Sequence, residues 1–413
     1  MRKIALFTAA ALAASLAQAD DVGSFTVLPY AALSVSADGK TVVGDYTASA
    51  QDYLWMWNAS TGVVDIGGKS AINPGAGNAY ISADASRIYG TALDANGVRN
   101  MSVYNVASGQ WTSLGGLGGY SSTSGMSADP AANQALYLAT GTAWGSSADG
   151  KYIVGQSYQT GGGTNNSRAT IWNTQTGTLT NLGNNPGVTA GPNQRSRAQG
   201  ISDDGRVVGG FGGGNTPLVW TDLDGDGVYD VTKVNTASGK TVNGVFAISG
   251  NGMYAVGAGS ITNTSGSAYR YNVATHGIDM LGKLDMNSGG IDTATAVSAT
   301  GSVIVGFEDA ASGNPAARNG FIWIDGLGIQ SLDSYLAGWG IDTDNSFNFA
   351  TPTAISADGL NIVGFGYTAG SNASVSFVVN LPAAAAVPEP SSYALLLAGL
   401  GFTAALVRRR RRA

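Results

Sequence analysis

Hydrophobic and polar positions alternate along most of the chain in short runs, which are separated by turns rich in serine, aspartate and glycine. The clearest run is Ser36–Gly44, where Ser-Ala-Asp-Gly is followed by two valines and a closing glycine. Asp-Gly favours a tight turn, since glycine accepts a positive φ and aspartate bonds to its own backbone. The apolar residues that follow favour a buried strand. This stretch therefore predicts two strands that meet at a turn.

The same stretch returns six more times along the chain. The further copies are Ser82–Gly90, Ser147–Gly155, Ser202–Gly209, Ser249–Gly257, Ser298–Gly306 and Ser356–Gly364. A short segment with apolar residues three apart precedes each copy, as at Phe25 and Leu28, and an aromatic or apolar strand follows it, as at Trp55 and Trp57. Each unit therefore predicts four strands, a to d, with the repeated stretch forming the turn between a and b.

The order of these segments predicts how the units assemble. The first d segment precedes the first a strand, while the last unit stops at its c strand near Asn380. A ring of four-stranded blades would be closed if the N-terminal strand completed the last blade, and closure removes exposed sheet edges. The sequence thus predicts an all-β, seven-bladed β-propeller over residues 20–380. An open β-solenoid is the alternative, and it would need no closing strand.

One insertion interrupts the period. The segment Gly115–Gly141 contains an extra Ser127-Ala128-Asp129-Pro130 that is followed by no c-strand pattern. We interpret this segment as a decayed repeat or a long loop.

The first 19 residues have the pattern of a signal peptide. Arg2 and Lys3 precede an apolar core, and small residues stand at Ala17 and Ala19, where signal peptidase requires them. The pattern predicts cleavage after Ala19 and export of the body.

The composition changes after residue 380. Residues 381–387 form an Ala/Pro linker, and residues 388–413 contain Pro388, Glu389 and Pro390, an apolar segment at 391–407 and the arginines Arg408, Arg409, Arg410, Arg411 and Arg412. As a helix, this apolar segment would be roughly 25 Å long, which is barely enough to cross the hydrocarbon core of a bilayer. The arginines would hold that end in the cytoplasm. The tail therefore predicts a C-terminal transmembrane helix.

This tail resembles the PEP-CTERM sorting signal of Gram-negative bacteria, which joins Pro-Glu-Pro, a short membrane helix and an arginine cluster in this order. The resemblance implies recognition by an exosortase and processing near Pro388–Pro390. It also implies an inner-membrane-tethered precursor that later reaches the cell surface or the extracellular matrix, in hosts that make exopolysaccharide and biofilm. Such a tail is sometimes labelled an ice-binding protein C-terminal region, but the body has no regular Thr-x-Thr face.

The body resembles the HAF family of extracellular repeats over about residues 25–380. The resemblance rests on Ser147–Gly155, on Ile171-Trp172 and on Leu182-Gly183. The usual His-Ala-Phe of that family is replaced here by Arg168-Ala169-Thr170 or Asn319-Gly320-Phe321. The resemblance implies an architecture more than an activity.

Composition and charge narrow the function classes. The chain has 61 glycines and 12% charged residues, which suits an exported, turn-rich β protein, and it has no cysteine for a disulfide or thiolate metal site. Without the basic residues of both chain ends 14 Lys and Arg remain, and without Glu389 26 acidic residues remain, so the body carries about −12. A nucleic-acid partner is therefore not expected, because it would require a basic surface.

One stretch has the pattern of a metal site. Its candidate calcium ligands are the side chains of Asp222, Asp224, Asp226 and Asp230 and the carbonyl of Val228. Clustered oxygens suit Ca²⁺, although the glutamate of an EF-hand is replaced by Lys233. The stretch resembles the calcium loops of integrin-type propeller repeats, which lie in a hairpin between strands. We expect a structural calcium ion here, and a solvated acidic turn is the alternative.

Catalytic patterns are scarce in the sequence. His276 is the only histidine and lies in a turn, and Glu308 is the only glutamate of the body, so a Glu/Glu glycosidase pair is excluded while Asp pairs stay open. We interpret the repeat serines as turn-closing residues and the strand-c aromatics as packing between blades. Trp144 and Trp339 lie off that aromatic column and are better candidates for an exposed contact.

Together these patterns predict a non-catalytic binding or structural propeller that contacts polysaccharide or another envelope protein. A secreted propeller enzyme acting on glycans is the competing hypothesis. Converging acidic and polar groups in a deep central pocket would favour the enzyme, whereas a shallow surface of Ser, Thr and Asn would favour the binder.

Overall fold

The computed structural model describes residues 22–383, with gaps at 49–50, 69–76, 124, 162, 184, 189–193, 236–241, 261–265, 286–288, 310–312, 342, 345 and 372. Residues Gly23–Leu381 form one compact unit. The predicted signal peptide, the sorting motif and the apolar segment 391–407 lie outside the described residues. No helix in the described part of the chain is long and apolar enough to cross a membrane.

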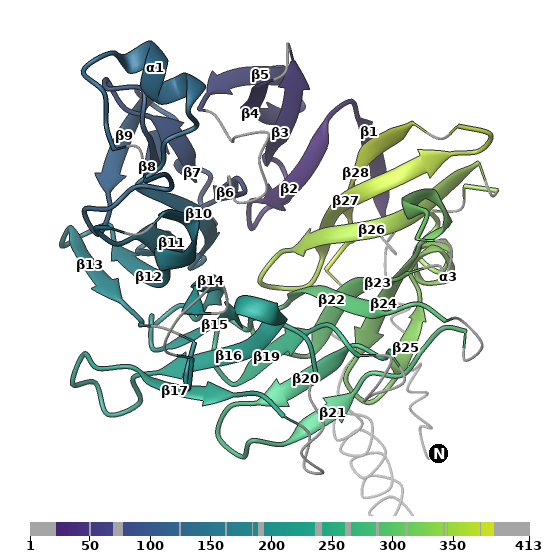
Figure 1. Ribbon diagram of the computed structural model, residues 1–413. Coiled ribbons are helices and arrows are strands. Elements are labelled where there is room, and N and C mark those ends of the chain that lie inside the picture. Colours follow the sequence, from purple (N-terminus) through teal and green to yellow (C-terminus); the bar gives the residue numbers. More distant parts are fainter. Residues whose placement is uncertain are drawn as a thin grey trace, which may run out of the picture. The chain divides into compact units, whose positions relative to one another are not determined.

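Seven antiparallel four-stranded sheets surround a common axis (Figure 1). The first three blades are β2(Ala31–Val35), β3(Val42–Ala48), β4(Gln51–Asn58), β5(Gly62–Gly67); β6(Tyr80–Ile81), β7(Arg87–Leu93), β8(Arg99–Asn105), β9(Gln110–Gly115); and β10(Gly141–Ser146), β11(Tyr152–Tyr158), β12(Ser167–Asn173), β13(Thr178–Asn181). The next two are β14(Ser196–Ile201), β15(Val207–Gly212), β16(Thr216–Thr221), β17(Asp230–Lys233); and β18(Val245–Ile248), β19(Tyr254–Gly257), β20(Tyr269–Asn272), β21(Ile278–Met280). The last two are β22(Asp292–Val297), β23(Val303–Glu308), β24(Asn319–Ile324), β25(Gly328–Ser331); and β26(Phe347–Ile355), β27(Asn361–Thr368), β28(Ser374–Asn380), β1(Ser24–Leu28).

In the described part of the chain, helices occupy only the connections between strands. The α-helices are α1(Pro130–Ala135) and α3(Leu332–Ala337), and the 3₁₀ turns are η1(Gly163–Asn166), η3(Gly213–Asn215) and η4(Pro315–Ala317). Helix α1 lies in the insertion Gly115–Gly141, which is therefore more than a loop. Its Asp129 side chain accepts a hydrogen bond from the backbone N–H of Ala131 as the N-cap, so the extra Ser-Ala-Asp-Pro begins a helix here instead of closing a hairpin.

The ring is closed by its first strand. Strand β1 pairs with β28 in antiparallel register from Ser24 opposite Asn380 to Leu28 opposite Ser376. The innermost strands also contact one another in turn around the axis, and β26 of the last blade contacts β2 of the first. This arrangement confirms the predicted seven-bladed propeller and its N-terminal closing strand, and it excludes an open solenoid.

The repeat serines hold the a–b turns, as the sequence predicted. Each serine is buried, and its Oγ accepts a hydrogen bond of 2.9 to 3.1 Å from the backbone N–H five residues further on. The turn residue three after the serine has a positive φ in all seven copies; it is glycine in six of them and Ala85, with φ 58°, in the second. The turn therefore depends on one buried hydroxyl and one residue that tolerates the left-handed region.

The residue after each serine joins neighbouring blades. The N–H of Ala37 donates to the carbonyl of Ala83 at 3.0 Å, and Ala83 donates to Ala148 at 2.7 Å. The remaining junctions are linked by Ala148 N to Asp203 Oδ1, Asp203 N to Gly250 O, Asn251 N to Ala299 O, Ala299 N to Ala357 O, and Asn361 Nδ2 to Ala37 O. We call this closed series of hydrogen bonds the turn belt. The close approach of adjacent turns explains why alanine or glycine stands in most copies at the position after the serine.

A β-bulge lies in the innermost strand of six blades, three residues before the repeat serine. The bulged residues are Leu33, Trp144, Gln199, Phe246, Thr295 and Thr353. The Oγ1 of Thr295 donates to the carbonyl of Pro352, and that of Thr353 to the carbonyl of Ala32, so both hydroxyls link neighbouring blades. Because a bulge redirects a side chain, these six residues depart from the regular alternation of their strands.

The aromatic residues of the c strands form the cores between the blades. Trp55, Trp220, Tyr269 and Phe377 are fully buried, and Trp172 and Trp323 are less than 10% exposed. Their position confirms the packing interpretation and leaves these rings unavailable to a ligand.

Candidate functional site

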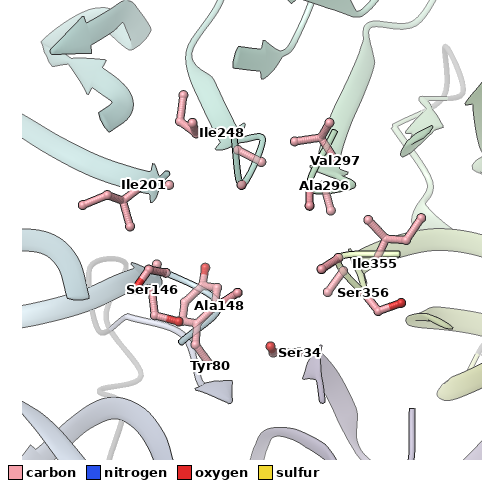
Figure 2. A pocket seen from close by; sticks show the side chains of 18 of the residues that line it. Ser34, Tyr80, Ser146, Ala148, Ile201, Ile248, Ala296, Val297, Ile355 and Ser356 are labelled. Carbon is pink, nitrogen blue, oxygen red and sulfur yellow. The ribbon is translucent and has the colours of Figure 1, made fainter. Parts of the chain in front are cut away.

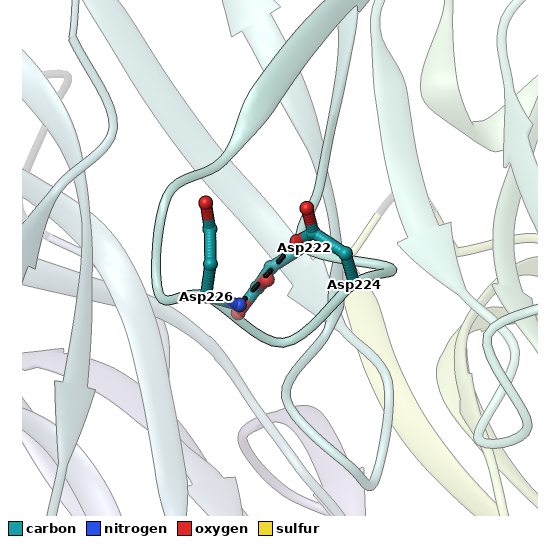
Figure 3. A group of neighbouring side chains, drawn as sticks. All are labelled: Asp222, Asp224 and Asp226. Carbon is teal, nitrogen blue, oxygen red and sulfur yellow. Dashed lines mark hydrogen bonds between the residues drawn. The ribbon is translucent and has the colours of Figure 1, made fainter.

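The acidic loop between β16 and β17 brings three of its predicted ligands together (Figure 3). Carboxylate oxygens of Asp222, Asp224 and Asp226 all lie within 4.8 Å of one another. The two oxygens of Asp222 accept hydrogen bonds from the backbone N–H groups of Gly225 and Gly227, at 2.9 and 3.3 Å, and both glycines have a positive φ. The tight glycine turns therefore curl the loop around Asp222 and turn the three carboxylates toward one point.

One other predicted ligand does not join this cluster. Asp230 is the first residue of β17 and its carboxylate lies outside the group, while the backbone N–H of the exposed Val228 donates to Asp226. The guanidinium of Arg206 packs beside Gly225, so a cation of the chain itself already borders the loop. The loop thus offers three carboxylates to a cation, fewer than the sequence predicted.

A cavity of about 200 Å³ lies on the axis at the end of the ring where the a–b turns meet (Figure 2). All seven blades contribute to its wall, mainly with small or apolar residues such as Ala148, Ile201, Ile248 and Ile355. Most of the polar residues in the wall are serines and threonines. Among the described residues that line the wall, only Asp203 has a carboxylate, which accepts the hydrogen bond from Ala148 in the turn belt.

The described residues contain one buried carboxylate pair. Asp292 and Glu308 face each other across β22 and β23, and the Nζ of Lys283 lies 3.8 Å from an oxygen of Asp292 and 4.0 Å from one of Glu308. All three side chains are at most 5% exposed, and Lys283 also donates to the carbonyl of Gly290. Burial raises the pKa of Asp292 to about 7, and the ammonium of Lys283 opposes this rise. We call these three residues the ion cluster.

In the ion cluster, the side chain of Lys283 lies between the two carboxylates, where a glycosidase would bind its substrate. Two catalytic carboxylates must flank a sugar and its water, whereas here a lysine side chain fills the gap and solvent is excluded. Its residues come from a d–a connection and from the pairing of two strands, and the sequence carries no local signal for their meeting. This explains why an Asp/Glu pair could not be located beforehand.

The remaining candidate residues have structural partners. The Nδ1 of His276 is hydrogen-bonded to the hydroxyl of Tyr271, and His276 lies in a turn with φ 58°. Trp339 packs against the core of the last blade, and Trp144 is half-buried beneath the guanidinium of Arg197. The sequence predicted exposed contacts at both tryptophans. Instead, Trp339 is half-buried against a hydrophobic core, and Trp144 contacts the guanidinium of Arg197.

An aromatic group that sequence reasoning missed lies on the first blade. Tyr30, Tyr46 and Tyr53 stack in a row with ring centroids 4.9 and 5.4 Å apart. The hydroxyl of Tyr46 donates to Asp65 at 2.9 Å, and this bond raises the pKa of Tyr46 to about 12. The three tyrosines come from a loop and two strands, so only the pairing of β3 with β4 brings them into one row.

Comparison with known proteins places the tail in a defined class of sorting signal. Residues 386–412 match the PEP-CTERM protein-sorting motif, and this range includes Pro388–Pro390 and the five C-terminal arginines. The chain therefore carries a signal for export, with exosortase processing of a precursor that is first tethered at the membrane. No curated protein matches the chain.

Several solved structures resemble the body in fold. TolB from Acinetobacter baumannii is 13% identical with a TM-score of 0.41, over 88% of this chain and 97% of that one. The propeller domain of the Trilobed protease from Pyrococcus furiosus is 11% identical with a TM-score of 0.45, over 83% and 92%. A prolyl endopeptidase is 11% identical with a TM-score of 0.47, over 88% of this chain and 51% of its own length, so the chain spans about half of that enzyme. These likenesses concern the fold alone.

Proposed function

We propose that the propeller acts after export as a non-catalytic binding or structural protein of the cell surface or extracellular matrix, where it contacts polysaccharide or another envelope protein. The sorting motif supports the exported location. The binding role is supported mainly by the wall of the axial cavity, in which hydroxyl and small apolar groups from all seven blades surround one carboxylate that is already hydrogen-bonded. Recognition by such a scaffold would be provided by its loops and cavity walls.

The alternative of a glycan-active enzyme lacks a comparable observation. The one buried carboxylate pair among the described residues is sealed from solvent and shares the cation of Lys283. A general acid must reach the oxygen of its substrate, so a buried pair is poorly placed for hydrolysis.

Calcium in the acidic loop would be structural in this proposal. The three carboxylates of Asp222, Asp224 and Asp226 supply the hard oxygen ligands that Ca²⁺ prefers, and water would complete the coordination. The ion would stiffen the outer hairpin of the fourth blade, far along the sheet from the axis.

A glycan array probed with recombinant residues 20–381, in EDTA and in 2 mM CaCl₂ (about this concentration saturates sensor-type sites), tests the proposed function. Binding to a defined set of polysaccharides without release of shorter products supports it. Cleavage of a bound glycan would instead favour the enzyme, and an array without any bound glycan would leave envelope proteins as the contact, to be tested by crosslinking at the cell surface.

A further inference from the structure

Arg197 is held between two aromatic rings near the axis of the ring. Its guanidinium carbon lies 3.6 Å from the ring centre of Trp144, on the third blade, and 4.5 Å from that of Phe211, on the adjacent strand β15. Stacking of this kind fixes the plane of the guanidinium and covers its faces, while its N–H groups point outward along the edge.

The edge of this guanidinium has no partner in the described part of the chain. Arg197 forms no hydrogen bond or ion pair there, and its Nε is shielded from solvent without an acceptor. A guanidinium has five N–H donors, and donors removed from water without acceptors destabilise the folded protein. Burial accordingly lowers the pKa of Arg197 to about 10.

The surroundings of Arg197 supply hydroxyl groups and a second cation. Tyr80 on β6, Tyr158 on β11 and Arg195 on the segment before β14 all influence its charge, and no carboxylate does. Tyr80 belongs to the second blade and Tyr158 to the third, so groups from two other blades act on the charge of Arg197.

A comparison of the seven repeats also distinguishes Arg197 from the residues at equivalent positions. Arg197 stands five residues before its repeat serine, and the equivalent positions of the other blades are Ala31, Gly77, Thr142, Gly244, Thr293 and Thr351. Six small residues leave room around a single long, charged one. An arginine at this position is therefore a property of one blade and not a requirement of the fold.

We propose that the edge of Arg197 binds the carboxylate of a uronic acid in an acidic glycan, with the hydroxyl of Tyr80 and the ring of Trp144 contacting the sugar. The planar guanidinium matches a carboxylate in two parallel hydrogen bonds, and the adjacent Arg195 adds charge. Aromatic rings and hydroxyl groups side by side suit a sugar, which has both C–H faces and hydroxyl edges. This inference rests on the proposed function and names the class of polysaccharide.

Calorimetric titration of residues 20–381 with a galacturonate hexamer, in EDTA, tests the proposal. We expect the hexamer to bind, its methyl ester of equal length to bind at least tenfold more weakly, and Arg197→Gln to lose at least tenfold in affinity for the acid. Arg197→Lys should fall between, since an ammonium cannot form the two parallel bonds. Arg270→Gln is the matched control, because Arg270 also lies between two rings but is paired with Asp279 and Asp325, and its variant should bind like the wild type.

Three results would overturn the proposal: unchanged affinity in a folded Arg197→Gln variant, no binding of the galacturonate hexamer by the wild type, or equally tight binding of a poly-glutamate peptide. Far-ultraviolet circular dichroism and the thermal midpoint verify that each variant is folded. The glycan array distinguishes a failure of the uronic-acid proposal from a failure of the proposed function. Neutral glycans that bind independently of Arg197 would remove only the uronic-acid assignment, whereas an array with no bound glycan would remove polysaccharide binding altogether.

Discussion

Arg197 on the fourth blade and Arg270 on the fifth are each held between two aromatic rings, but only Arg270 has carboxylate partners. Arg270 stacks on Tyr254 and Trp323, both at 4.5 Å, and its guanidinium pairs with Asp279 at 3.1 Å and Asp325 at 3.4 Å. Arg197 has the rings and lacks the carboxylates. The ion cluster extends the comparison, since Lys283 lies between two acidic groups. A buried cation with carboxylate partners in the chain needs no ligand for its charge. A buried cation without such partners marks a position where an anionic ligand would supply the missing hydrogen bonds.

The largest expected effect comes from removing the cation of the ion cluster. Lys283→Met leaves Asp292 and Glu308 facing each other in a space that excludes water, so we expect a loss of about 3–5 kcal/mol in the free energy of unfolding at pH 8. Urea denaturation measures it, with Lys40→Met at an exposed site as the control. A loss below about 1 kcal/mol would mean that the cluster is not balanced by Lys283.

Calcium should produce the next largest effect, at the surface. If the acidic loop holds the ion, a calcium concentration 100 times Kd stabilises the fold by about 2.7 kcal/mol. The double variant Asp224→Ala with Asp226→Ala should lose this gain, measured as the calcium-dependent shift in Tm. Asp230→Ala should keep it, because its carboxylate lies outside the cluster. An equal shift in the double variant would identify the loop as a solvated turn.

The pH dependence of the free energy of unfolding tests the raised pKa of Asp292. The folded protein keeps a proton on this carboxyl up to a pKa of about 7, whereas the unfolded chain releases it near pH 4. The contribution of Asp292 to stability is therefore full below pH 4 and is lost as the pH rises through 7. Between pH 5 and 8 the wild type should lose roughly 2 kcal/mol relative to Asp292→Asn. Parallel stability curves for the two proteins would contradict this assignment.

The smallest expected effect is the difference in stability between variants of the two stacked arginines. Arg197→Met removes no ion pair and leaves an apolar chain between the rings, so we expect a change within about 1 kcal/mol in either direction. Arg270→Met removes hydrogen bonds to Asp279 and to the carbonyl of Gly301 and should cost about 1 kcal/mol more. Thermal unfolding of both variants side by side measures the difference. A greater loss for Arg197→Met would show that Arg197 is structural.

Much of the fold was predictable because it repeats. The register of serine, glycine and β-branched residues predicts the a–b hairpins, and the displaced first strand predicts closure. Both are confirmed by the pairing of β1 with β28 and by the seven serine-centred turns. The acidic loop lies between β16 and β17, in the hairpin that the sequence predicted, since its pattern is local in sequence.

Contacts between strands and between blades could not be predicted in the same way. The turn belt needs the spacing of adjacent turns, the tyrosine row needs the register of β3 with β4, and the meeting of Asp292 with Glu308 needs that of β22 with β23. Arg197 gave one usable signal, a long charged residue at a position that is small in every other repeat. Alignment of the repeats against each other would have revealed it.

The pairing of Ser24 with Asn380 also has a consequence for export. When a chain crosses a membrane from its N-terminus, β1 emerges first and its only sheet partner, β28, emerges last. Every shorter intermediate is an open arc with two unpaired edges, and the entropy of joining ends so far apart is recovered only at the final step. Completion of the ring therefore reports that translocation has reached residue 380, immediately before the sorting tail, so that the order of secretion sets the order of folding.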